Sequence, residues 1–148
     1  MKLSEELRRL LADTRLKLHS SDFFIVSLDS SKHKVESLLE GASPFYSLTY
    51  TTDEISLVIK RDEWEGNRDR YTGSKYEGPY KVITLDIVLD LSVVGYLAVI
   101  SQLLADRGIS IYALSTYLKD HILVKKEDRD EAVRVIEGLI ESTGRSDI

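Results

Sequence analysis

The sequence predicts an α+β protein built from two packed units whose strands are mostly antiparallel. Three observations lead to this expectation. Segments in the second half of the chain follow the order strand, helix, strand, strand, helix. Such a unit needs one more strand to complete a ferredoxin-like sheet, yet little strand-like sequence remains after Ser142. The first half contains spare strand-like segments, so we expect the two units to share strands.

The first half is expected to contain an amphipathic helix, an extended segment, a short helix and a β-hairpin, over residues 3–14, 16–29, 33–41 and 44–60. Ser4 stands where a helix N-cap is expected, and Leu7 and Leu11 repeat at helical spacing behind it. Gly41 marks the end of the short helix. In the hairpin, two runs rich in β-formers flank a turn at 52–54.

The second half is expected to contain a strand, a helix, two strands and a last helix, over residues 80–90, 91–108, 109–126 and 127–142. Ile83 and Leu85 belong to an alternating pattern typical of a strand with one buried face. Ser92 is a candidate N-cap, and Gly108 a stop signal, for the helix that follows. The last helix begins with acidic residues, as the helix dipole favours.

Residues 62–78 are polar, contain glycines and have few aliphatic side chains, which is typical of a loop. Trp64 is the one large apolar residue there, and we expect it to pack back on the fold. The predicted organisation is therefore an N-terminal unit with a leading helix, a linker and a C-terminal unit, over residues 1–65, 66–79 and 80–142.

Composition excludes several classes of function. The 148 residues carry 25 acidic and 20 basic side chains, a net charge of −5, without a dense basic patch, so no nucleic-acid partner is expected. No apolar run approaches the ~20 residues of a membrane helix, and no membrane association is expected. The segment MKLSEELRRLL lacks the apolar core of a signal peptide, and the chain has no cysteine. We expect a cytoplasmic protein.

Signatures of catalysis and of cofactor binding are missing from the sequence. It contains neither a GxSxG motif nor a glycine-rich phosphate loop. His19, His33 and His121 have no histidine partner at helical spacing, so no metal site is expected. The carboxylates belong mostly to solvated helix faces. We therefore expect no enzyme, no catalytic residues and no cofactor.

One constellation could bind a small zwitterion. The segment LDLSVVGYLA at 89–98 is a strand-to-helix turn whose free backbone N–H groups attract a carboxylate. The neighbouring hairpin, ALSTYLKDHILV at 113–124, carries Asp120, which could pair with an ammonium group. The alternative is purely structural: Ser92 caps a helix and Asp120 shapes a turn.

The same segments resemble the ACT domain family, most closely the branch of small tandem-ACT proteins and CASTOR-type arginine sensors related to aspartate kinase regulatory domains. The matching positions are Ser92, Gly95, Leu104, Ala105, Gly108, Ile109, Ser110, Ile111, Ser115, Thr116, Asp120, Leu123 and Val124. Upstream, a pattern similar to the first, degenerate ACT unit of these proteins recurs at Phe45, Ser47, Thr49, Asp53, Glu54, Ser56 and Val58. The chain departs from the pattern at LDLS, where proline or phenylalanine is usual, and at His121, where an aromatic residue is common.

The resemblance implies a non-catalytic regulatory sensor that binds a free amino acid and forms a homodimer. The implied ligand-binding residues are Leu91, Ser92, Val93, Val94, Gly95, Ser115, Thr116 and Asp120. Two alternatives remain: a structural or interaction ACT protein with a vestigial pocket, and a regulatory subunit of an enzyme of amino-acid biosynthesis such as aspartate kinase. Either could have a regulated protein partner.

Overall fold

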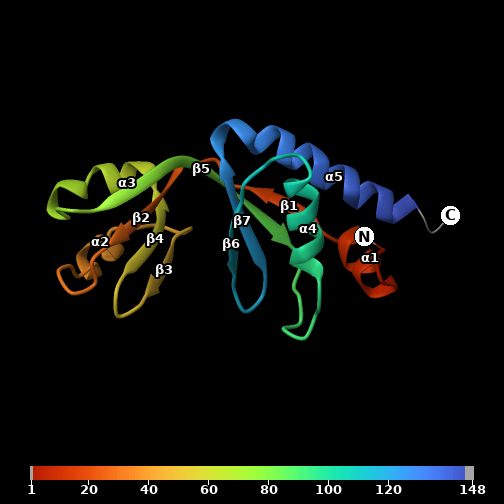
Figure 1. The fold of residues 1–148 in the computed structure, drawn as a ribbon, viewed down its shortest axis with the longest axis horizontal. Helices are drawn as coiled ribbons and strands as arrows, with labels where there is room; N and C mark the ends of the chain where they lie inside the picture. The colour runs from red at the N-terminus through yellow and green to blue at the C-terminus, as the bar shows by residue number, and fades with distance from the viewer. Residues whose placement is uncertain (1, 146–148) are drawn as a thin grey trace. The chain divides into compact units, whose positions relative to one another are not determined.

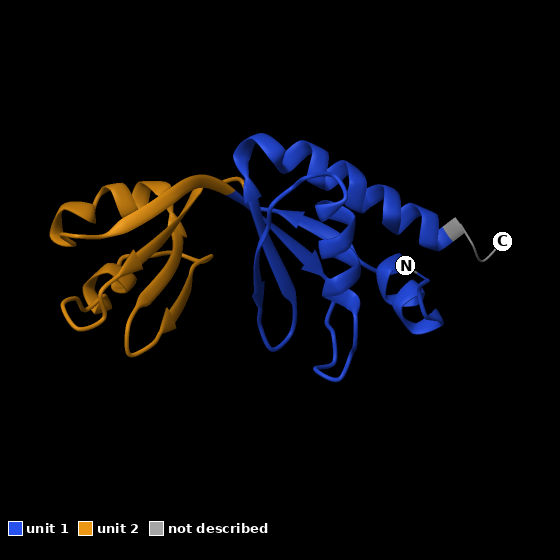
Figure 2. Cartoon of the chain, viewed as in Figure 1, with its two compact units in different colours: residues 1–19, 81–148 blue, residues 20–80 orange. Residues whose placement is uncertain are grey.

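The computed structural model describes residues 2–145, and the chain divides into two compact units. Unit 1 comprises residues 1–19 and 81–148, and unit 2 comprises residues 20–80 (Figure 2). The leading helix therefore belongs with the C-terminal part of the chain, whereas the sequence suggested that it belongs to the N-terminal unit. The reason is strand pairing, because the strand after this helix pairs with residues 83–86.

Unit 2 follows the order strand, helix, strand, strand, helix, strand (Figure 1). Its elements are β2 (Phe23–Leu28), α2 (Glu36–Glu40), β3 (Ser47–Tyr50), β4 (Ile55–Lys60), α3 (Arg61–Glu65), the 3-10 helix η1 (Arg68–Arg70) and the first part of β5 (Lys75–Asp86). The strands lie in the order β3-β4-β2-β5, and β2 pairs antiparallel with β4 and β5, as β3 does with β4. This order is that of a ferredoxin-like sheet.

The core of unit 2 explains why residues 61–80 are more regular than the sequence indicates. Trp64 on α3 is fully buried and stacks on Tyr71, with a centroid distance of 5.8 Å, so the prediction that it packs back on the fold is confirmed. The predicted loop over 62–78 is nevertheless wrong in part, since it holds most of α3, all of η1 and the start of β5. The first residues of β5 are exposed and polar, and this hides a strand from a hydrophobicity pattern.

Unit 1 contains the remaining elements, which are α1 (Glu5–Ala12), β1 (Arg15–Leu18), the second part of β5, α4 (Tyr96–Ala105), β6 (Tyr112–Ser115), β7 (Asp120–Lys125), η2 (Lys126–Asp128) and α5 (Arg129–Arg145). Its strands lie in the order β1-β5-β7-β6. β1 pairs antiparallel with β5, and β6 with β7. The strand that the β-α-β-β-α sequence lacks at its end is thus supplied by β1, and unit 1 also has a ferredoxin-like strand order.

One face of the unit 1 sheet carries the core. Ile83 and Leu85 of β5, with Ile122 and Val124 of β7, pack against α4, α5 and Leu11 of α1. Successive strand residues point to opposite faces. Asp120, two residues before Ile122, therefore lies on the helix-covered face, and His121 lies on the other. The predicted α+β class and the mostly antiparallel sheet are confirmed.

Candidate ligand-binding site

The loop between β5 and α4 is shaped by Asp90. Its Oδ1 accepts hydrogen bonds from the Ser92 backbone N–H at 2.8 Å and from the Ser92 hydroxyl at 2.6 Å. Its carbonyl accepts from the Val93 N–H at 3.0 Å. The Ser92 hydroxyl bond, followed by the backbone bond, lowers the pKa of Asp90. The Ser92 side chain is therefore occupied within the turn.

α4 begins later than the sequence indicates. Its N-cap is Gly95, with φ of 90° in the left-handed region, and no side chain caps the helix. The prediction that Ser92 is the N-cap is wrong, because its hydroxyl bonds to Asp90 and three residues separate it from the first helical residue, Tyr96. The first-turn N–H groups of α4 thus lack a side-chain acceptor, which leaves them available to an anion.

The hairpin turn between β6 and β7 brings the acidic side chain into place. The Thr116 N–H donates to the Lys119 carbonyl at 2.9 Å, and the Thr116 hydroxyl donates to the same carbonyl at 3.0 Å. Ser115 and Asp120 are cross-strand partners, and the Ser115 hydroxyl donates to Asp120 Oδ1 at 2.7 Å. Asp120 is half-buried and forms no ion pair with any residue that the structure describes.

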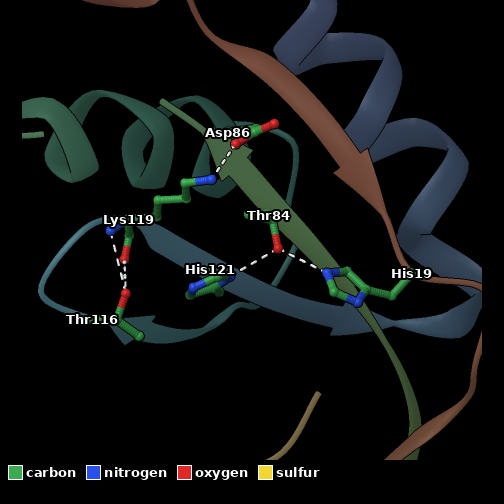
Figure 3. A network of polar contacts seen from close by, with 6 residues as sticks. All are labelled: His19, Thr84, Asp86, Thr116, Lys119 and His121. Atoms are coloured by element: carbon green, nitrogen blue, oxygen red, sulfur yellow. Dashed lines mark hydrogen bonds and ion pairs between the residues drawn. The ribbon is translucent and has the colours of Figure 1, made fainter. Parts of the chain in front are cut away.

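Two contacts connect the hairpin turn between β6 and β7 to the end of β5 and the loop that follows it. The Leu89 N–H donates to the Leu118 carbonyl at 3.0 Å. Lys119 Nζ contacts Asp86 Oδ1 at 2.5 Å, as Figure 3 shows. The hydrogen bond from Lys119 is the main reason that the pKa of Asp86 is lowered. The ammonium of Lys119 is therefore already paired with a carboxylate.

Between the loop, the start of α4 and the hairpin turn lies a cavity of about 290 Å³. Its lining comprises Leu89, Asp90, Leu91, Val93, Gly95, Tyr96, Leu97, Ala98, Ser115, Thr116, Tyr117, Leu118, Lys119 and Asp120. Six of the eight residues predicted to bind a ligand are therefore gathered around one space. The other two, Ser92 and Val94, are not part of the lining, and Val94 is 84% exposed.

Sequence reasoning missed the buried wall formed by Tyr96. This side chain is 2% exposed, and its hydroxyl lies 2.6 Å from Thr14 Oγ1, at the junction of α1 and β1. Burial raises the pKa of Tyr96 to about 12, and the charge of Asp120 adds to this shift while the Thr14 hydrogen bond opposes it. Tyr96 is the first residue of an apolar helix, and no sequence pattern there indicates that its side chain forms a buried wall of the cavity.

The histidines on the opposite face of the sheet do not reach the cavity. Thr84 is 3% exposed, and its hydroxyl lies 2.8 Å from both His19 Nε2 and His121 Nδ1 (Figure 3). Burial lowers the pKa of His121. Within the part of the chain that the structure describes, no three histidine, aspartate or glutamate side chains are placed to hold a metal ion, and no helix is long and apolar enough to cross a membrane.

The sequence of this region matches a known family. Residues 76–138 match the model of the ACT domain, and over these residues the resemblance expected from the sequence is confirmed. No curated protein matches the chain.

Solved structures share the fold over most of the chain. A Vibrio cholerae protein of unknown function, described as a possible transport protein, is 21% identical with a TM-score of 0.71, over 90% of this chain and 95% of that one. The aspartate kinase of Clostridium acetobutylicum is 18% identical with a TM-score of 0.66, over 86% of this chain but 34% of the kinase. The regulatory subunit of aspartate kinase from Thermus flavus is 11% identical with a TM-score of 0.62, over 84% and 95%. At such identities the likeness shows the fold.

Proposed function

We propose that this chain is a non-catalytic regulatory protein of the ACT type that binds a free amino acid. One observation carries the proposal: Asp120, a carboxylate without an ion-pair partner among the described residues, faces the same cavity as the uncapped N-terminus of α4. A zwitterion presents one positive and one negative group a few bonds apart. The cavity offers a partner for each of them.

In the proposed complex the ligand ammonium pairs with Asp120, which the Ser115 hydroxyl orients through its 2.7 Å hydrogen bond. The ligand carboxylate accepts hydrogen bonds from backbone N–H groups at the end of the Leu91–Gly95 turn and the start of α4. Thr116 contributes to the wall, although its hydroxyl already donates within the hairpin turn. The cavity volume, about 290 Å³, suits a ligand of amino-acid size.

We further infer that unit 2 is a degenerate ACT-like unit and that the two units share strands. The ferredoxin-like strand order of unit 2 supports the first inference. The position of the unit boundary, which falls within β5 between residues 80 and 81, supports the second. The absence of cysteine in the sequence supports a cytoplasmic location.

A homodimer, or a complex with a regulated protein, is supported by the rim of the cavity. Five large apolar side chains on the two bordering loops are exposed by half or more: Val88, Leu91, Val94, Tyr117 and Leu118. Clustered exposed apolar residues mark protein contacts more often than isolated ones do.

The same rim favours the second candidate function, an interaction protein or an enzyme's regulatory subunit whose pocket is vestigial. Light scattering of the purified chain at micromolar concentrations tests the dimer, which a monomer mass would contradict.

The amino-acid proposal is tested by one conservative substitution. Asp120→Asn keeps the shape of the side chain and removes its charge. Loss of the ammonium partner should cost ~2–5 kcal/mol of binding, at least a tens-fold loss in affinity. Calorimetry against the twenty amino acids identifies the tightest ligand of the wild type, and the variant is then measured with that ligand.

Asp53→Asn is the matched control, because Asp53 stands in the equivalent hairpin turn of unit 2. This control should keep the wild-type affinity. Asparagine is a favourable turn residue, so a purely structural Asp120 would tolerate the change. Equal affinity in the wild type and Asp120→Asn would therefore rule out the ammonium role. No binding to the wild type would favour the vestigial pocket.

A further inference from the structure

Each of the three elements that border the cavity contributes apolar side chains to its lining. Leu89, Leu91 and Val93 come from the β5–α4 loop, Leu97 and Ala98 from α4, and Leu118 from the hairpin turn. An apolar lining favours a ligand group that leaves water without losing hydrogen bonds.

The charged side chains in the lining already have hydrogen-bond or ion-pair partners. The ammonium of Lys119 contacts Asp86 at 2.5 Å. Asp90 is exposed and receives the two hydrogen bonds from Ser92 that shape the loop. In the proposed function Asp120 takes the ligand ammonium, which leaves Asp90, an exposed carboxylate that is hydrogen-bonded but not ion-paired within residues 2–145, as the remaining charged group of the lining.

A charged ligand side chain would therefore be poorly accommodated. An acidic side chain would lie near Asp90 and Asp120 and would have to share the ammonium of Lys119 with Asp86. A basic side chain could reach Asp90, but a pair with this exposed carboxylate would be weakened by solvent. Burying either charge against the leucines without a partner is unfavourable.

We infer that the ligand is an α-amino acid with an uncharged aliphatic side chain, of about three or four carbon atoms, such as valine, leucine or isoleucine. The inference rests on the proposed function and adds to it the class of the ligand side chain. The volume of about 290 Å³ has room for such a side chain beside the two charged groups.

Isothermal calorimetry with glycine, leucine, isoleucine, valine, lysine, arginine, aspartate and glutamate tests the inference on the whole chain. An aliphatic ligand should bind at least ~50-fold more tightly than glycine, since each buried methylene contributes several-fold. Lysine, arginine, aspartate and glutamate should each bind more weakly than leucine. Tighter binding of any of these four, or equal binding of glycine and leucine, would overturn the inference.

A substitution in the wall separates side-chain recognition from recognition of the charged groups. Leu118 is 51% exposed in the hairpin turn, so Leu118→Ser should fold. It should weaken leucine binding about tenfold and leave glycine binding within about twofold. Leu48→Ser, the same change at an exposed position of unit 2, should alter neither affinity.

The outcomes distinguish this inference from the proposed function. Binding of lysine or arginine more tightly than leucine, lost in Asp120→Asn, would uphold amino-acid binding and overturn the aliphatic class. Equal loss of leucine and glycine affinity in Leu118→Ser would likewise overturn it. Failure of all eight amino acids to bind, while one of the other twelve binds, would overturn this inference and leave the proposed function standing. Failure of all twenty would overturn both.

Discussion

Units 1 and 2 have the same ferredoxin-like strand order but differ at one cross-strand pair. The same type of backbone hydrogen bond closes both hairpin turns. In unit 1 the Thr116 N–H donates to the Lys119 carbonyl at 2.9 Å, and in unit 2 the Thr51 N–H donates to the Glu54 carbonyl at 2.8 Å. The pair beside the turn is Ser115 and Asp120 in unit 1, and Tyr50 and Ile55 in unit 2. The position of the half-buried carboxylate in unit 1 is thus taken by a fully buried isoleucine in unit 2.

The loops before the first helices show which features belong to the fold. In unit 2, Asp29 Oδ1 accepts from the Ser31 N–H at 2.9 Å and the Ser31 hydroxyl at 2.6 Å, as Asp90 does from Ser92 in unit 1. The Asp–Ser hydrogen bonds occur in both units, although unit 1 has Asp120 and unit 2 has Ile55 beside the hairpin turn. These bonds therefore stabilise the loop and are not specific to a ligand site. Ser92 is therefore a turn residue, whereas Asp120 is the residue that distinguishes the candidate site of unit 1 from the equivalent position of unit 2.

The largest effect is expected from exchanging the two distinguishing residues. Ile55 is 1% exposed in the core of unit 2, so Ile55→Asp buries a carboxylate without a partner. We expect the free energy of unfolding, measured by urea denaturation, to fall by about 4 kcal/mol. The reverse change, Asp120→Ile, should alter it by no more than about 1 kcal/mol, because it leaves no buried charge behind, and should abolish amino-acid binding. Equal losses of stability in the two variants would contradict this contrast between the units.

A second difference lies at the first helical residue, which is buried Tyr96 in α4 and exposed Glu36 in α2. Burial raises the pKa of Tyr96 from 10.0 to about 12. A raised folded-state pKa stabilises the protein below pH 10, and this contribution is lost as the pH rises from 10 to about 12. The loss should amount to roughly 2–3 kcal/mol.

Tyr96→Phe tests this assignment, because it removes the titrating group and leaves the ring. Denaturant unfolding between pH 9 and 12 should show a smaller loss of stability in Tyr96→Phe than in the wild type. At neutral pH the variant should be less stable by about 1 kcal/mol, since the hydrogen bond with Thr14 is lost. Tyr50→Phe, which removes an exposed phenol from unit 2, should keep the wild-type pH dependence. Identical profiles for Tyr96→Phe and the wild type would show that Tyr96 is not the group responsible.

Periodicity predicted those elements whose apolar residues face one core. The alternation of Ile83 and Leu85 predicted the second part of β5, and both side chains are buried. The exposed polar start of β5 has no such alternation, and its composition is typical of a loop. Likewise, a cap signal at Ser92 could not be distinguished from a side-chain turn with Asp90, because both use the same residue types. The ion pair of Lys119 with Asp86 joins residues 33 positions apart, and no local pattern contains it.

The smallest effect concerns the helix N-caps, which differ in backbone conformation. α2 is preceded by Val35 with φ of −116°, whereas α4 is preceded by Gly95 with φ of 90°. A Cβ at Gly95 would lie 3.4 Å from Leu7 Cδ1 and would stand on a left-handed backbone. Gly95→Ala should therefore lower the free energy of unfolding by about 1–2 kcal/mol in urea denaturation.

The matched control for Gly95→Ala is Gly138→Ala, in the middle of α5, where an added Cβ meets no atom within 4 Å. Alanine is the better helix former there, so the same substitution should stabilise the protein by about 0.5–1 kcal/mol. Opposite signs for the two variants would tie the effect to the left-handed conformation at the start of α4, because the added group is identical. A Gly95→Ala variant as stable as the wild type would contradict this prediction. It would show that the β5–α4 loop does not require a left-handed residue at the N-cap of α4.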